Sequence, residues 1–212
     1  MHPSDCPPWE YDNHPNKNQE LPIRSQEVLT ELAQGHLDTI ENAVDSRQIH
    51  QKLFLQLVPP GYEYYAGHYR GEMFRCLRYC QVRIRSDPRV GYPPMQVGTA
   101  MHQLENVIRR GLRALDSLGR TTGTTVTPVQ RILYVVELAS HILELFLRVH
   151  PYVNGNGHAA RFIVWVILWR YGYWPKHWPL EPRPNPPYID VIRMYRDGQR
   201  DPLRAYILQT LI

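Results

Sequence analysis

The sequence has few of the cysteines that stabilise small proteins through disulfides or metal sites. It holds three cysteines in 212 residues, an odd number with no C-x-x-C pair. This count fits a reducing cytoplasm better than the disulfide framework of a secreted scaffold. A chain of this length buries about 70% of its unfolded surface, so we expect one domain that folds without a metal or a disulfide.

Long hydrophobic runs are also absent. The first residues have neither the basic nor the apolar region of a signal peptide, and we expect none. The most apolar segment, 162–169, is too short to span a bilayer and is soon followed by Arg170 and Pro175. No internal repeat is visible. We therefore expect a cytoplasmic protein without a membrane partner.

Charge is moderate. The formal net charge is +4 and the pI is near 9.0, which favours anionic ligands but does not indicate a nucleic-acid-binding protein. Arginines gather in one region: Arg70, Arg75, Arg78, Arg83, Arg85 and Arg89. This region is either a solvated face or a docking surface for an acidic target or for nucleotide phosphates, and the sequence leaves both readings open.

Helical hydrophobic periodicity is abundant and predicts an all-α bundle of six to eight helices. The expected helices cover 26–34, 36–51, 95–118, 129–149, 156–171, 188–196 and 201–212. We place the two most apolar, 129–149 and 156–171, at the centre. Residues 1–22 are rich in proline, which predicts an extended arm, partly docked through Trp9 and Tyr11. Residues 81–85 alternate polar and apolar side chains, which predicts a short strand, and 90–92 could return against it as a hairpin.

The segment that indicates chemistry joins the two central helices and reads HPYVNGNGHAAR, from His150 to Arg161. Gly155 and Gly157 permit positive φ and a close backbone approach. The helix that follows presents unpaired N–H groups and the positive end of its dipole, which suits a phosphate. Arg161 can fork onto a phosphate and His150 can accept a proton near neutral pH. Asn and Gly are also ordinary turn residues, so the simpler reading is a connecting turn.

This segment resembles the signature of Fic/Doc proteins, His-Pro-Phe-x-(Asp/Glu)-Gly-Asn-Gly-(Arg/Lys)-x-x-Arg. The matching residues are His150, Pro151, Gly155, Asn156, Gly157 and Arg161, and Tyr152 is a close substitute for the Phe. Two positions depart: Asn154 replaces the acidic residue and His158 replaces Arg or Lys. The resemblance extends from about residue 25 to the C-terminus. It implies a Fic-like domain over 23–212, with a β-hairpin flap near 72–92 and the signature at 150–161.

The resemblance implies a nucleotidyltransferase that moves AMP from ATP onto a Ser, Thr or Tyr hydroxyl of a target protein or of itself. His150 would take the proton of the attacking hydroxyl. The phosphate-binding residues would be Gly155, Asn156, Gly157, His158 and Arg161. Of these, Asn156 would also steady the loop, and Arg161 would clamp the γ-phosphate while pyrophosphate leaves. The resemblance leaves a homo-oligomer open.

The two departures bear on metal and phosphate binding. The family's carboxylate brings Mg²⁺ to the phosphates, so the resemblance implies Mg²⁺ as a cofactor, with Asn154 as a weak ligand because its carbonyl adds no negative charge. His158 is largely neutral at pH 7 where Arg or Lys would be charged. Two alternatives follow. One is a related activity, such as AMP removal or transfer of another phosphate-bearing group; the other is a catalytically silent helical module that binds nucleotide or protein.

Glu41 allows two readings. It lies at the edge of the apolar stripe of the expected helix 36–51, where a glutamate is ordinarily a solvated rim charge. Residues 37–42 also resemble the inhibitory helix of many Fic proteins, (Ser/Thr)-x-x-x-Glu-(Gly/Asn), except that Leu37 replaces the Ser or Thr. The resemblance then implies that Glu41 pairs with Arg161 and holds the resting enzyme inactive.

Overall fold

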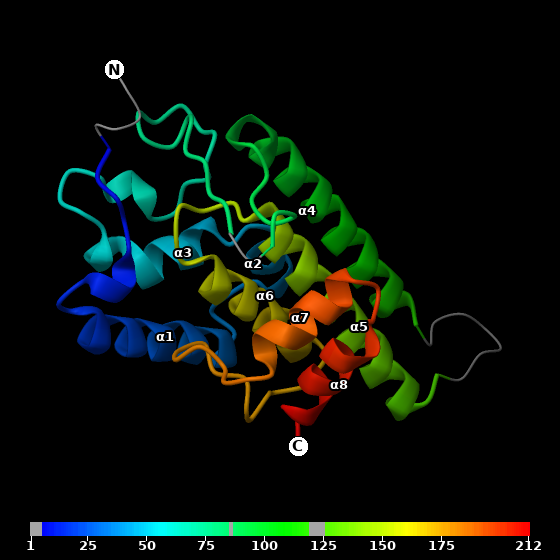
Figure 1. Ribbon diagram of the computed structural model, residues 1–212. Coiled ribbons are helices and arrows are strands. Elements are labelled where there is room, and N and C mark those ends of the chain that lie inside the picture. The colour runs from blue at the N-terminus through cyan, green and yellow to red at the C-terminus, as the bar shows by residue number, and fades with distance from the viewer. Residues whose placement is uncertain (1–5, 85–86, 119–125) are drawn as a thin grey trace.

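The computed structural model describes residues 6–84, 87–118 and 126–212 (Figure 1). Within these ranges it contains eight α-helices and no regular β-strand, which confirms the predicted all-α fold. The helices are α1 (Lys17–Ala33), α2 (Thr39–Val44), α3 (Arg47–Phe54), α4 (Pro94–Ser117), α5 (Pro128–Val149), α6 (Asn156–Arg170), α7 (Tyr188–Arg196) and α8 (Asp201–Gln209). Short 3-10 turns are η2 (Tyr11–Asn13), η3 (Leu55–Leu57) and η4 (Glu63–Tyr65). None of the described helices combines the length and the hydropathy needed to cross a bilayer.

The centre of the bundle is α6, and Figure 1 shows it between the N-terminal helices and the α4–α5 pair. Its side chains are buried on every side, as expected for a helix that is apolar all round. α5 packs along α6 and also contacts α4, α7 and α8. Thr127 and Gln130 form a reciprocal capping box at the start of α5, with Pro128 at its first position. The helices predicted from periodicity at 129–149 and 156–171 are therefore present.

The N-terminal helices differ from those predicted. α1 begins at Lys17 and contains Pro22, although proline removes a backbone donor from a helix interior. Burial of Leu21 and Val28 on the same helix outweighs that cost, since each is at most 1% exposed. The expected helix 36–51 is interrupted because the backbone of Asp45 is extended, so that α2 ends before it and α3 begins after it.

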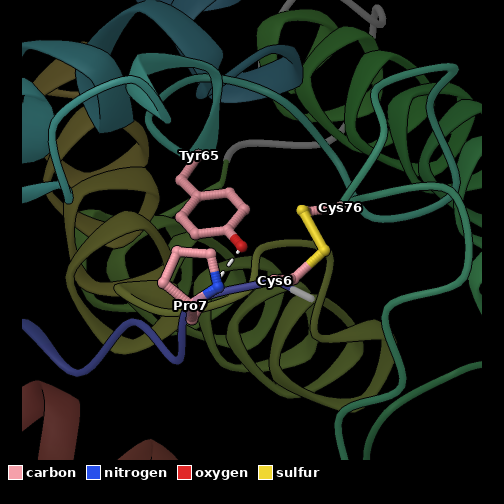
Figure 2. The surroundings of a disulfide bond; sticks show 4 residues. All are labelled: Cys6, Pro7, Tyr65 and Cys76. Atoms are coloured by element: carbon pink, nitrogen blue, oxygen red, sulfur yellow. Dashed lines mark hydrogen bonds between the residues drawn. A yellow bond between two sulfur atoms is a disulfide. The ribbon is translucent and has the colours of Figure 1, made fainter. Parts of the chain in front are cut away.

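The arm before α1 is covalently attached to the domain. A disulfide joins Cys6 to Cys76, with a Cα–Cα distance of 5.7 Å, and Cys80 is the free thiol (Figure 2). Beside the bond, the hydroxyl of Tyr65 donates a hydrogen bond to the carbonyl of Pro7 at 3.2 Å. The bond was not foreseen from the cysteine count, because cysteines 70 residues apart in sequence meet in the fold, and whether folding requires it stays untested. The argument from cysteine count for a cytoplasmic location no longer holds, and that location stays an untested prediction.

The segment expected to be a hairpin flap has little regular pairing in the described residues. Ile84 and Asp87 form one isolated antiparallel bridge. The segment expected to return against 81–85 bonds to α5 instead: the N–H groups of Gly91 and Tyr92 donate to the carbonyls of residues 148 and 149. The predicted strand pair is thus replaced by an irregular loop fastened to the end of α5. We keep the word flap for residues 81–91.

Candidate active site

The turn between α5 and α6 is held in a conformation that few sequences could adopt. His150 lies at the end of α5 with φ 55° and ψ 62°, the one non-glycine residue with positive φ in the described ranges. Gly155 precedes α6 with φ 76°, and a Cβ there would lie 2.5 Å from the ring of Phe54. Asn156 closes the turn: it accepts from the Tyr152 N–H at 2.8 Å and donates to the Tyr152 carbonyl at 2.9 Å. This geometry supports the loop-steadying role expected of Asn156.

The ring of His150 is prepared to accept a proton. Its Nδ1 lies 3.2 Å from the carbonyl oxygen of Leu147. Because a carbonyl only accepts hydrogen bonds, Nδ1 carries the proton of the neutral ring and Nε2 carries the lone pair. Burial lowers the pKa of His150 to about 4, with a smaller contribution from the positive charges of Arg70 and Arg196. His150 is therefore a neutral base at pH 7.

Arg161 presents a positive charge to the same place. Its side chain is 1% exposed, and Nε and Nη2 both donate to the carbonyl of Leu180, at 3.3 and 2.7 Å. In the described part of the chain its guanidinium pairs with no carboxylate. The remaining nitrogen, Nη1, lies so close to Gly157 that a Cβ there would be 3.1 Å from it. A buried cation that donates to an uncharged carbonyl and meets no carboxylate favours an incoming anion.

His150, Gly157 and Arg161 line one cavity of about 320 Å³. Its other walls come from the flap, α5, α7 and the loop before α7. The apolar and aromatic lining residues are Ile84, Val90, Leu147, Tyr188, Ile189 and Ile192, the further cationic ones are Arg183, Arg193 and Arg196, and the acidic one is Asp87, which pairs with Arg196. The cavity thus joins an apolar slot to a group of side chains that is mainly cationic. A ligand with a flat apolar part and phosphate groups matches this lining.

Asn154 does not face this cavity as a metal ligand. Its Oδ1 accepts from the N–H of Gly155 at 2.8 Å, and its Nδ2 donates to the carbonyl of Trp9 at 3.1 Å and to Glu10 at 2.9 Å. The side chain therefore anchors the N-terminal arm to the turn. In the described residues no group of three or more His, Cys, Asp or Glu side chains could hold a metal ion. The residues present do not fit a protein-held Mg²⁺ at this position.

His158 is also directed away from the cavity. Its Nε2 bonds to Glu181 at 2.7 Å, and Glu181 also forms an ion pair with Lys17 at 2.9 Å. The ring packs edge-on against Phe54 and Tyr11. The phosphate-binding role expected of this side chain is therefore not supported. The N–H of residue 158 is also engaged, since it donates to the Gly155 carbonyl at 3.1 Å.

Glu41 lies on α2 and its carboxylate pairs with Arg109 of α4 through two hydrogen bonds of 3.1 Å. The predicted pair between Glu41 and Arg161 is not formed, because Arg161 donates inward to Leu180 while Glu41 remains largely exposed. The inhibitory role of Glu41 stays an untested hypothesis without the ion pair on which it was based.

Three residues at this site were not found from the sequence. Arg70 bonds the backbone of His150, Glu181 holds His158, and His50 places its Nε2 2.9 Å from the Asn154 carbonyl. Arg70 lies in the arginine-rich stretch that was noted only for its charge. The other two carry no local signal, because their roles depend on contacts between distant parts of the chain.

Comparison with known proteins agrees with the signature. The model of the Fic/DOC family matches residues 41–168, which include α2 through most of α6. A search of curated proteins found no match.

Proposed function

The chain belongs to the Fic/DOC family, whose members are commonly enzymes that transfer nucleotide groups, and we propose that it transfers AMP from ATP onto a hydroxyl side chain of a protein. One observation carries this proposal: a buried neutral histidine and a buried guanidinium without a carboxylate partner among the described residues line the same cavity. Such a pair suits proton acceptance beside phosphate binding.

The reaction assigns one task to each group. The oxygen of the target hydroxyl attacks the α-phosphorus and its proton passes to Nε2 of His150. The bond from the α-phosphorus to the bridging oxygen breaks, and pyrophosphate leaves with that electron pair. Arg161 stabilises the negative charge on the departing phosphates. The N–H groups at the start of α6, at Asn156 and Gly157, have no partner within the helix and suit phosphate oxygens.

The apolar walls suit the rest of the nucleotide. Ile189 and Ile192 of α7 face the flap across the cavity, and a nucleobase has flat surfaces that such a slot can cover. Because Asn154 is engaged by the arm, we assign no metal ligand to this chain. Mg²⁺ in this proposal is the ion that accompanies ATP.

A second candidate function follows from two contacts: Asn154 bonds to the N-terminal arm, and His158 bonds to Glu181. Both departures remove phosphate or metal contacts that the signature implied. They favour either related chemistry, such as AMP removal or transfer of another phosphate-bearing group, or a silent module that binds a nucleotide. His150 separates these classes, because a binding module has no use for a proton acceptor.

The test is incubation of the purified protein with α-labelled ATP, with Mg²⁺ or Mn²⁺, and measurement of label on the protein itself. His150→Ala should reduce labelling by about 10² to 10⁴-fold and leave nucleotide affinity nearly unchanged. Arg161→Ala should weaken both. His102→Ala is the matched control, since this histidine is exposed on α4. Binding of ATP without labelling in the parent protein would support the silent module, and equal labelling by the parent and His150→Ala would refute the proposed base.

A further inference from the structure

Arg70 is a buried cation whose partners identify a role beyond packing. It lies in the loop between η4 and the flap, and its exposed fraction is 0%. A guanidinium in such surroundings must satisfy five N–H donors within the protein. A carboxylate would be the usual partner, because two oxygens match the fork and cancel the charge.

Every donor of Arg70 instead reaches a backbone carbonyl. Nε donates to His150 at 2.9 Å, and Nη2 donates to His150 at 2.6 Å and to Val149 at 3.1 Å. Nη1 donates to Cys80 at 3.1 Å and to Tyr92 at 3.0 Å. Five donors thus make five bonds to four carbonyls. The guanidinium is fully used and leaves no donor for a ligand.

The four carbonyls belong to two segments that lie far apart in the sequence. Val149 and His150 end α5, where helix carbonyls lack partners within the helix and the dipole favours a cation. Cys80 and Tyr92 flank the flap, one just before it and one just after it. The backbone N–H of Arg70 adds a bond to the carbonyl of Pro151 at 2.8 Å. One residue therefore joins both ends of the flap to three consecutive residues, the last of α5 and the first two of the signature.

The conformation of His150 gives this junction its significance. An L residue with φ 55° is in the left-handed region, which is strained for any residue with a Cβ and persists only where neighbours enforce it. Two of the five bonds from Arg70 fix the carbonyl of this very residue. His150 and the flap residues Ile84 and Val90 line the same cavity.

We propose that Arg70 is a positioning residue that holds the His150 backbone in its left-handed conformation and ties it to both ends of the flap, so that the base and the opposite cavity wall keep one fixed spacing. This inference rests on the proposed function only for the role of His150 as the base. The junction itself can be measured without activity.

Arg70→Lys tests it, because an ammonium keeps the charge but offers three donors from one point and cannot span four carbonyls. We expect kcat for labelling to fall about 10²-fold, the effect of about 1 Å of misplacement, while KM for ATP stays within about threefold. By NMR, the flap amides should lose hydrogen-exchange protection and the His150 ring should change its titration midpoint together. Arg78→Lys is the control, since Arg78 is exposed on the same loop and should change none of these.

A second variant covers the case in which Arg70→Lys does not fold. Gly91 has φ 93°, and a Cβ there would lie 2.1 Å from the Val82 carbonyl. Gly91→Ala therefore displaces the flap ends without altering any atom of Arg70 or His150. We expect it to change the His150 titration midpoint as well.

The outcomes are separable. A parent protein that never labels removes the proposed function, but joint changes in flap protection and His150 titration would still support the junction. An unchanged His150 titration in a folded variant whose flap has lost protection would overturn the inference. Loss of kcat and ATP affinity in equal proportion would assign Arg70 a structural role only.

Discussion

Three buried neutral histidines should make the protein lose stability in mild acid. His50 is fully buried; its Nδ1 accepts from the Gly67 N–H and its Nε2 therefore donates to the Asn154 carbonyl. Burial lowers the pKa of His50 to about 3 and the pKa values of His150 and His158 to about 4. Protonating His50 would also break the bond from Gly67. All three rings lie in or beside the signature turn, so acid acts at the site itself.

Whether acid raises or lowers the free energy of unfolding depends on which state, folded or unfolded, binds protons first. An unfolded histidine titrates near pH 6.5, roughly, so above that pH both states are neutral and stability does not change. As the pH falls below it, the unfolded chain takes up three protons that the folded chain refuses until about pH 4. Each proton changes the unfolding free energy by about 1.4 kcal/mol per pH unit. The slope should approach about 3.6 kcal/mol per pH unit, and the loss from pH 7 to pH 5 should be about 5.5 kcal/mol.

Urea unfolding followed by tryptophan fluorescence across this pH range measures that slope. His150→Asn removes one of the three groups, and Asn tolerates the left-handed backbone that residue 150 requires. The slope of this variant should be about two thirds that of the parent, with little change in stability at pH 7.5 or above. His102→Asn, at an exposed histidine, should keep the parent slope. If His150→Asn also keeps the parent slope, His150 is not buried and neutral as described.

Three further predictions concern the arm and α2. Cys6→Ser opens a loop with a sequence separation of 70. In urea unfolding it should lower the free energy of unfolding by up to about 4 kcal/mol, whereas Cys80→Ser should leave it unchanged. Equal stabilities of the two variants would show that the disulfide does not form. Asn154→Asp removes two donated hydrogen bonds and places a second carboxylate beside Glu10. It should therefore lower the free energy of unfolding by about 1 to 3 kcal/mol, and adding Glu10→Gln should recover part of that loss. A gain in stability would contradict the anchoring role. Glu41→Gly breaks only an exposed ion pair and should leave self-labelling within about twofold, while a hundredfold rise would restore the inhibitory hypothesis.

The parts predicted from sequence were those that depend on neighbours along the chain. The helices at the centre follow from an apolar period, and the turn joining them is a contiguous motif, so His150 and Arg161 were found as a pair and do line one cavity. Pro22 was misread as a helix limit because propensity is local, whereas the burial that overrides it is set by the fold.

The parts that could not be predicted depend on contacts between distant segments. Asn154 looked like a weakened metal ligand, but its partners come from residues 9 and 10, and nothing near either segment signals the meeting. Arg70 looked like one charge among several, because a pattern of arginines does not distinguish a solvated cation from one that binds four carbonyls. Glu41 fitted an inhibitory pattern, yet its nearest cation in the fold is Arg109.

The complete burial of α6 affects how the site can open. A segment exchanges its amide hydrogens by local unfolding only where few buried contacts must break. The first residues of α6 form the turn, and their helix is buried along nearly its whole length. The amides of His158 and Ala159, which donate to the Gly155 carbonyl, should therefore exchange only when the entire protein unfolds, so the temperature at which the turn is lost should equal the melting temperature of the chain. Admission and release of ligands must then depend on movements of the flap or of α7, with the turn as the stationary side.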